Sequence, residues 1–448
     1  MNNIKIWVAA VAALFVASFV FAGANSPAGS PAGSGDGANI NPEEEEIIVL
    51  NGYKRVKTGI EVLRENGFEI LRGKKVALAT NPSGVDADLV STADILHRAP
   101  EVDLVALFAP EHGIRGNIYA GSEIPDTKDR ATGLPVYSLY GKTKKPSPAQ
   151  LSGIDVVVYD IQDTGCRSYT FISTLGLLME ACAENGVELV VLDRPNPLGG
   201  LKVEGPLVEP DCVSFISQFP IPYIYGLTPG ELAIYFNEEG LLWGGNASGR
   251  KCKLSVVPME GWCRDMVYAE TRLPWVLPSP HIPTAETSFY YPASGIIGEL
   301  SGFLSIGIGY TLPFQLFGAA WITDAEEFTK NLNALELPGV RFRPIVYNPY
   351  YGGSANKTLN GAQLYFTDYS AARLTEIQFY AMQVAVEMYP QRRPLSNPDG
   401  KYRMFDLACG TKEIRLRLSK DYKADAVIGY WRKDEEAFRK ASSKYYLY

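Results

Sequence analysis

The feature that most constrains the fold is a series of short apolar runs between residues 75 and 197, each followed by polar residues. The runs cover residues 76–80, 103–108, 155–159 and 188–192. They are continuously apolar and rich in β-branched residues, which is typical of strands buried on both faces. Helix-like segments at 89–98 and 170–185 separate them, and Gly186 is a helix-ending signal. Alternating strands and helices predict right-handed crossovers and a parallel sheet.

Other segments are organised differently. Thr228 begins a helix with a capping box that we expect to run to about residue 239. Residues 112–151 are rich in Gly, Pro and charged residues, and we interpret them as a long loop that passes over the edge of the sheet. After about residue 265 the amino-acid composition changes, beginning with a Pro-rich stretch and then a Gly-rich stretch. We then expect helices at 324–335 and 374–388 and strands near Val340 and Gln363.

These patterns predict an α/β protein with a parallel-sheet N-terminal domain and a smaller α/β C-terminal domain. The N-terminus resembles a secretory signal, because Lys5 precedes an apolar stretch and small residues follow it. The alternative is an uncleaved N-terminal anchor. The predicted divisions are a signal peptide at 1–22, a flexible linker at 23–53, a first domain at 54–265 and a second at 266–448.

Charge and cysteine content exclude some classes of function. The 448-residue chain has a net charge of −8 and no basic block, so we expect no nucleic-acid partner. Its one long apolar stretch is N-terminal, so we expect no membrane insertion after signal cleavage. Without a CxxC pair, a P-loop or a complete GxGxxG motif, we expect no metal and no cofactor. Six cysteines leave open either a disulfide, such as Cys252 with Cys263, or buried free thiols.

All four predicted strands end in residue types that are able to bind a ligand or catalyse a reaction. Ligands bind at the carboxyl ends of the strands in open parallel sheets. The sequence therefore predicts a functional cleft at that edge. The candidate side chains near it are Asn81, Glu111, His112, Arg115, Asp160, Gln162, Asp163, Arg167, Tyr169, Asp193, Arg194 and Asn196.

Glu111 is the candidate general acid, because Pro110 and Gly113 suggest a fixed turn that aims its carboxyl. A loop carboxylate paired with Arg115 is the alternative. His112 either orients Glu111 or contacts substrate, or is simply structural. Arg167 is the natural partner for a substrate carboxylate, unless it forms a structural pair with an aspartate.

The four polar strand ends, together with later segments, resemble the NamZ-type exo-β-N-acetylmuramidases, a bacterial family formerly of unknown function. The resemblance covers about residues 57–448. The matching stretches are Thr80–Val85, Phe108–Gly116, Leu134–Lys142, Tyr159–Asp163, Arg167–Thr170, Leu192–Pro197, Glu204–Pro206, Leu277–Pro280 and Lys444–Tyr448.

The resemblance implies a Rossmann-like N-terminal domain, a smaller C-terminal domain and an active site between them. It implies release of N-acetylmuramic acid from the non-reducing end of peptidoglycan fragments or muropeptides. Together with the signal-like N-terminus, it predicts a secreted protein of the bacterial periplasm. Glu111 falls on the family's proposed catalytic glutamate. Asp160 or Asp163 then activates water or attacks, or the substrate's own 2-acetamido oxygen does so.

The second domain departs from the family pattern. His281 occupies a position where members usually carry Asn. Glu299 is retained in a segment whose other residues differ from the family pattern, and Ile306 and Ile308 replace a Glu and an Arg. We expect His281 and Glu299 to contact substrate. These departures support one alternative, a periplasmic glycan-binding protein without activity. A serine esterase is disfavoured, because no G-x-S-x-G motif lies on a strand-to-helix turn.

Overall fold

The computed structural model describes residues 54–111, 113–116, 127–141, 143–246, 249–397 and 400–448. The predicted signal peptide at 1–22, the predicted linker at 23–53 and His112 lie outside these residues. Residues 49–448 form one compact unit. The predicted division of this unit at residue 265 stays a prediction. Within the described residues, no helix is long and apolar enough to cross a membrane.

A seven-stranded sheet forms the first half, in the order β3-β4-β2-β1-β5-β6-β7. Its strands are β1 Lys75–Thr80, β2 Asp103–Ala109, β3 Thr127–Lys128, β4 Pro135–Ser138, β5 Val156–Asp160, β6 Glu188–Leu192 and β7 Lys253–Val257. All neighbours pair in parallel except β3 with β4. Counted along the chain, the parallel strands lie in the order 3-2-1-4-5-6, which is the order of Rossmann folds. The predicted fold class is confirmed.

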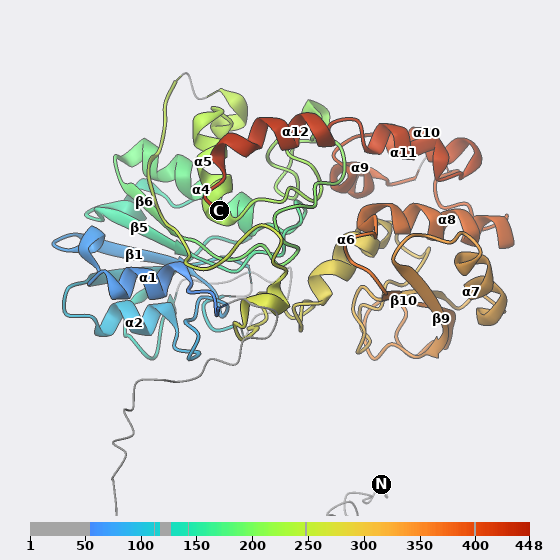
Figure 1. The fold of residues 1–448 in the computed structure, drawn as a ribbon, viewed down its shortest axis with the longest axis horizontal. Coiled ribbons are helices and arrows are strands. Elements are labelled where there is room, and N and C mark those ends of the chain that lie inside the picture. The colour runs from blue at the N-terminus through green and yellow to red at the C-terminus, as the bar shows by residue number, and fades with distance from the viewer. Residues whose placement is uncertain (1–53, 112, 117–126, 142, 247–248, 398–399) are drawn as a thin grey trace, which may run out of the picture. The chain divides into compact units, whose positions relative to one another are not determined.

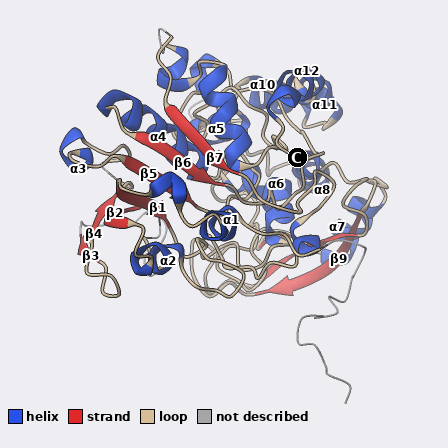
Figure 2. Cartoon of the chain, turned by 60° about the vertical axis from the view of Figure 1, so that its left-hand side comes forward, coloured by secondary structure: helices blue, strands red, loops and turns tan. Residues whose placement is uncertain are grey.

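Helices cover both faces of this sheet, as Figures 1 and 2 show. Along β1, Val76 and Leu78 join one buried cluster, whereas Ala77 and Ala79 join another. This alternation arises because successive side chains of a strand point to opposite faces. The helices of this half are α1 Gly59–Glu65, α2 Thr92–Arg98, α3 Pro148–Leu151, α4 Phe171–Asn185 and α5 Pro229–Glu238.

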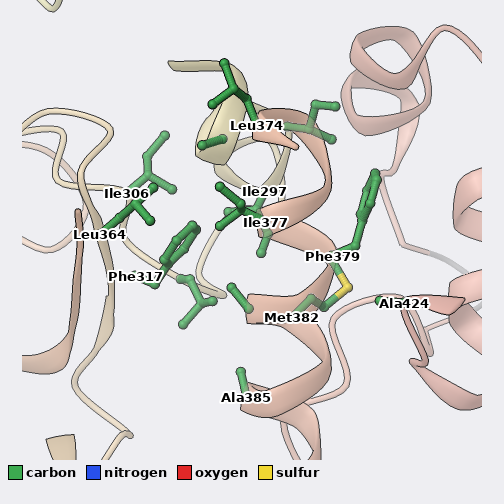
Figure 3. Packing of buried hydrophobic residues seen from close by; sticks show 14 of the residues in the cluster. Ile297, Ile306, Phe317, Leu364, Leu374, Ile377, Phe379, Met382, Ala385 and Ala424 are labelled. Atoms are coloured by element: carbon green, nitrogen blue, oxygen red, sulfur yellow. The ribbon is translucent and has the colours of Figure 1, made fainter. Parts of the chain in front are cut away.

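The second half holds a three-stranded antiparallel sheet, in the order β8-β10-β9. Its strands are β8 Leu316–Ala319, β9 Val340–Tyr347 and β10 Leu359–Phe366. The helices after β7 are α6 Thr287–Gly298, α7 Ala325–Asn333, α8 Ile377–Met388, α9 Arg403–Cys409, α10 Glu413–Asp421, α11 Asp425–Trp431 and α12 Glu435–Ser442. Figure 3 shows Phe317 and Leu364 packed toward Ile377 and Met382 of α8. This apolar layer holds α8 against the small sheet.

The local signals in the sequence explain most element boundaries. Gly186 ends α4 in the left-handed conformation, and the Thr228 side chain caps α5 by accepting from the Glu231 backbone. The expected helices at 324–335 and 374–388 correspond to α7 and α8. Within the predicted loop region at 112–151 the structure contains β3, β4 and α3. The two strands extend the sheet at this edge rather than only passing over it.

Candidate functional site

Residues that follow the carboxyl ends of β2, β4 and β5 line a cavity of the described part of the chain. Ala109 of β2 aligns with Ser138 of β4 in parallel register. Glu111 and Tyr140 each follow these residues by two positions, so they lie at neighbouring strand ends. Tyr169 belongs to the connection between β5 and α4. These elements bring the three side chains to the edge where open parallel sheets bind ligands.

The cavity has a volume of about 1010 Å³, and residues from both halves of the chain line it. The second half contributes α6, β8 and the connections around them, including His281 and Glu299. Pockets for small molecules typically enclose roughly 300–1,000 Å³, so this space accommodates a disaccharide. Among the described lining residues, the ones with a formal charge are Glu111, Lys144, Glu299 and Lys357.

Glu111 is half-buried in the cavity wall and lies near Tyr169. Burial raises the pKa of Tyr169, and the negative charges of Glu111 and Asp163 raise that pKa further. Tyr169 therefore stays a neutral hydroxyl near neutral pH. A carboxyl and a phenol side by side can donate protons and hydrogen bonds to a bound sugar.

A row of tyrosines links this carboxyl to the second one. The rings of Tyr169 and Tyr291 meet edge to face with centroids 5.1 Å apart. The Ser168 hydroxyl lies 2.9 Å from the Tyr291 hydroxyl and 2.9 Å from that of Tyr223. Burial raises the pKa of Tyr291, and the charge of Glu299 contributes in the same direction. Burial also raises the pKa of Glu299. Glu111 and Glu299 therefore both line the cavity, each close enough to one of these two tyrosines to raise its pKa.

The residues of the second half that are expected from the sequence to depart from the family pattern line the same cavity. His281 lines it, and its Nε2 lies 2.9 Å from the Tyr351 hydroxyl. Ile306 and Ile308, which are expected from the sequence to replace a Glu and an Arg, also line it. This part of the wall offers contact area rather than charge.

Asp160 is buried and is not among the residues that line the cavity. Only 1 % of its surface is exposed, and both its carboxylate oxygens bind the Arg194 guanidinium. The Thr92 hydroxyl donates to the same carboxylate, and Arg194 also donates to the Val85 carbonyl at 2.7 Å. Asp160 and Arg194 are thus a buried ion pair that joins the ends of three strands.

Asp163 and Gln162 are also held in the interior. The Asp163 carboxylate accepts hydrogen bonds from the Gly165 backbone at 2.9 Å and from the Tyr225 hydroxyl. Burial raises the pKa of Asp163 to about 7. The Gln162 amide donates to the backbone carbonyls of Asp163 at 2.9 Å and Pro195 at 2.8 Å. Both side chains brace the connection that presents Tyr169.

The candidates after β1 and β2 have partners of their own. The Asn81 amide donates to the Pro278 carbonyl at 3.2 Å, and its oxygen accepts from the Ser83 backbone at 2.9 Å. Arg115 pairs with Asp129 at 3.0 Å and with Asp94 at 3.2 Å. Asn81 and Arg115 line a separate cavity of about 170 Å³.

The loop after β6 is similarly engaged. The Asp193 carboxylate accepts from the hydroxyls of Thr228 at 2.7 Å and Tyr448 at 2.8 Å. Burial raises the pKa of Asp193 to about 6. Asn196 donates to the Leu227 carbonyl at 3.0 Å. These contacts attach α5 and the last residue of the chain to the sheet.

Arg167 does not reach the cavity. Its side chain is 1 % exposed and donates to the backbone carbonyls of Pro206 at 2.9 Å, Ile221 at 2.6 Å and Ala408 at 3.1 Å. Burial lowers the pKa of Arg167 to about 10. The guanidinium therefore holds together segments from both halves of the chain, in place of the substrate carboxylate or the aspartate pair considered from the sequence.

The structure thus separates the candidates into two groups. Glu111, Tyr169, His281 and Glu299 line the cavity. The other described candidates support it from below or beside it: Asn81, Arg115, Asp160, Gln162, Asp163, Arg167, Asp193, Arg194 and Asn196.

Sequence reasoning missed several residues of the cavity wall, including Lys144, Ser279 and Tyr291. Lys144 follows a fifth polar strand end, that of β4, which the Gly- and Pro-rich composition of its surroundings concealed. Tyr291 lies on α6, whose internal Pro292 weakens the helix signal. In the part of the chain that the structure describes, no group of three or more His, Cys, Asp or Glu side chains could hold a metal ion.

Comparisons with known proteins agree on one family. The models of the N-terminal and C-terminal domains of exo-beta-N-acetylmuramidase NamZ match residues 76–286 and 289–448. A peptidoglycan beta-N-acetylmuramidase NamZ of Bacillus subtilis is 41% identical over 88% of this chain and 92% of its own length.

Two crystal structures of DUF1343 family proteins from Bacteroides fragilis are also similar. One shares 54% identity at a TM-score of 0.83, and the other shares 29% identity at a TM-score of 0.68. Each alignment covers 88% of this chain and 99% of the other. The overall fold of this chain is thus similar to that of both crystal structures.

Proposed function

The chain belongs to the NamZ family of exo-beta-N-acetylmuramidases, and we propose that it is a glycoside hydrolase that releases N-acetylmuramic acid from the non-reducing end of peptidoglycan fragments. The observation that carries this proposal is Glu111, a carboxyl at a strand end that faces a cavity of disaccharide size. The family match extends over both halves of the chain that build this cavity.

In this proposal Glu111 protonates the glycosidic oxygen as the bond to the sugar breaks. A leaving alkoxide is unstable near neutral pH, so the reaction needs a positioned acid. Tyr169, beside Glu111, binds a sugar hydroxyl or the leaving oxygen as a neutral donor. Tyr291 supplies an aromatic edge for the sugar ring.

The second catalytic role belongs to a group that reaches the reacting carbon. Asp160 and Asp163 are both occupied in the interior, so their positions do not support that role. Glu299 faces the cavity, and the substrate carries its own 2-acetamido oxygen. Either the Glu299 carboxylate or the 2-acetamido oxygen would complete a mechanism that is known among glycosidases. Only the first mechanism requires the Glu299 carboxylate.

The direct test uses two disaccharides of the same sugars in opposite order. One carries N-acetylmuramic acid at the non-reducing end, and the other carries N-acetylglucosamine there. Mass spectrometry of the products should detect free N-acetylmuramic acid from the first disaccharide only. Tight binding of the first disaccharide without any released sugar would contradict the proposal and identify a glycan-binding protein.

We propose a periplasmic location from the signal-like residues 1–22. Fractionation of cells that express the whole chain, compared with a chain lacking residues 2–22, checks this proposal. The protein should appear in the periplasmic fraction only with that segment. A cytoplasmic whole chain would contradict it.

A further inference from the structure

Muramic acid differs from glucosamine by a lactyl ether that ends in a carboxylate, so a cation in the sugar site would favour muramic acid through a charge-assisted hydrogen bond. The residue expected for this task, Arg167, is buried among backbone carbonyls outside the cavity. Among the described lining residues, the lysines that face the cavity are Lys144 and Lys357.

The two lysines lie in different surroundings. Lys144 is half-buried on the connection after β4, the strand that pairs with β2 and therefore ends beside Glu111. Lys357 is exposed in the second half, and its ammonium group donates to the Gly353 carbonyl at 3.3 Å. Of the two lysines, Lys144 belongs to the connection that leaves the strand next to β2, and it lines the same cavity as the proposed proton donor.

The contacts of Lys144 position its charge without neutralising it. Its Nζ lies 4.3 Å from the centroid of the Phe215 ring, which also lines the cavity. A cation over an aromatic face is held in place but keeps its charge. Within the described residues, no carboxylate lies within 4.0 Å of this ammonium group. The neighbouring Lys145, by contrast, pairs with Glu180 at 3.1 Å and Glu184 at 2.7 Å.

We propose that Lys144, held over Phe215 in the wall of the cavity that Glu111 also lines, binds the lactyl carboxylate of the terminal muramic acid and so determines specificity for that sugar. This inference rests on the proposed function. In peptidoglycan the stem peptide is attached to this carboxylate through an amide, which removes the negative charge. Lys144 therefore favours peptide-free muramic acid over its amidated form.

Calorimetric binding tests the proposal independently of turnover. The probes are N-acetylmuramic acid and its lactamide, which differ only in the charge of the lactyl group. The wild-type protein should bind the acid about tenfold or more tightly, because a charge-assisted hydrogen bond is stronger than a neutral one. Lys144→Met should bind both probes equally, and Lys144→Arg should restore the preference. Lys145→Met is the matched control and should keep the wild-type ratio.

Kinetics on the two corresponding aryl glycosides gives the second readout. The Lys144→Met variant should raise KM for the acid substrate and leave KM for the amide substrate unchanged. Equal losses on both substrates would indicate a merely structural role and overturn the inference, as would a wild-type protein that does not distinguish the two probes. A protein that binds the acid selectively but cleaves neither substrate would refute the proposed hydrolase while leaving the assignment of Lys144 intact.

Discussion

Replacing Arg167 with methionine tests whether this buried guanidinium supports the fold or contacts substrate. The substitution removes donors from the carbonyls of Pro206, Ile221 and Ala408. A buried acceptor left without its donor costs about 1–3 kcal/mol. Three such losses therefore cost about 6 kcal/mol.

An opposing effect reduces this loss. Burial lowers the pKa of Arg167 to about 10, from an ordinary value of about 12.5 or higher. Burying this charged group therefore destabilises the native state by about 3 kcal/mol. A methionine side chain at the same position carries no charge and avoids this cost. The free energy of unfolding of Arg167→Met should consequently fall by about 3 kcal/mol, while KM of the folded enzyme stays unchanged.

Denaturant unfolding followed by tryptophan fluorescence, together with KM for a muramic acid glycoside, measures both quantities. Arg115→Met is a suitable control, because Arg115 is 39% exposed and its ion pairs contribute about 1 kcal/mol or less. An Arg167→Met protein of wild-type stability whose KM rises tenfold would refute the reasoning and return Arg167 to the substrate.

Three further predictions address the second carboxyl, pH dependence and the core. If Glu299 is the nucleophile or base, Glu299→Gln should lower kcat at least about 10²-fold, the usual minimum effect of removing such a group. A near-normal kcat in steady-state assays would assign that role to the 2-acetamido group of the substrate. The pKa of Asp163, raised to about 7, means that the folded protein holds a proton that the unfolded chain releases above about pH 4. Urea unfolding should therefore show wild type losing about 3 kcal/mol relative to Asp163→Asn between pH 5 and pH 8, and an unchanged difference would contradict this pKa. Trp431→Ala should cost about 3–5 kcal/mol in the same unfolding assay, because the fully buried indole also donates to Thr375 at 2.7 Å, and a loss below 1 kcal/mol would contradict that packing.

The regular part of the fold follows from local patterns. The apolar runs that become β1, β2, β5 and β6 are buried on both faces, so each is recognisable by itself. β4 has only four residues, of which two are buried, and gives no comparable pattern. Its strand conformation depends on pairing with β2, a contact that the sequence does not display.

The site was only partly predictable for a related reason. Polar residues at strand ends serve two purposes, and the sequence does not distinguish them. Glu111 turns into the cavity, whereas Asp160 turns toward Arg194, a residue 34 positions away along the chain. Which aspartate finds a buried cation depends on tertiary packing. The same holds for Lys144, whose neighbour Phe215 comes from a distant segment.

The central claim is that the Glu111 carboxyl is the proton donor. The most direct measurement compares Glu111→Gln with wild type on two muramic acid glycosides, one with a dinitrophenol leaving group and one with a sugar leaving group. Dinitrophenolate leaves without protonation, so its hydrolysis needs no general acid. We predict a loss of kcat of about 10²–10⁴-fold on the sugar glycoside and a far smaller loss on the dinitrophenyl glycoside. Equal losses on both substrates, or full activity on the sugar glycoside, would contradict the assignment.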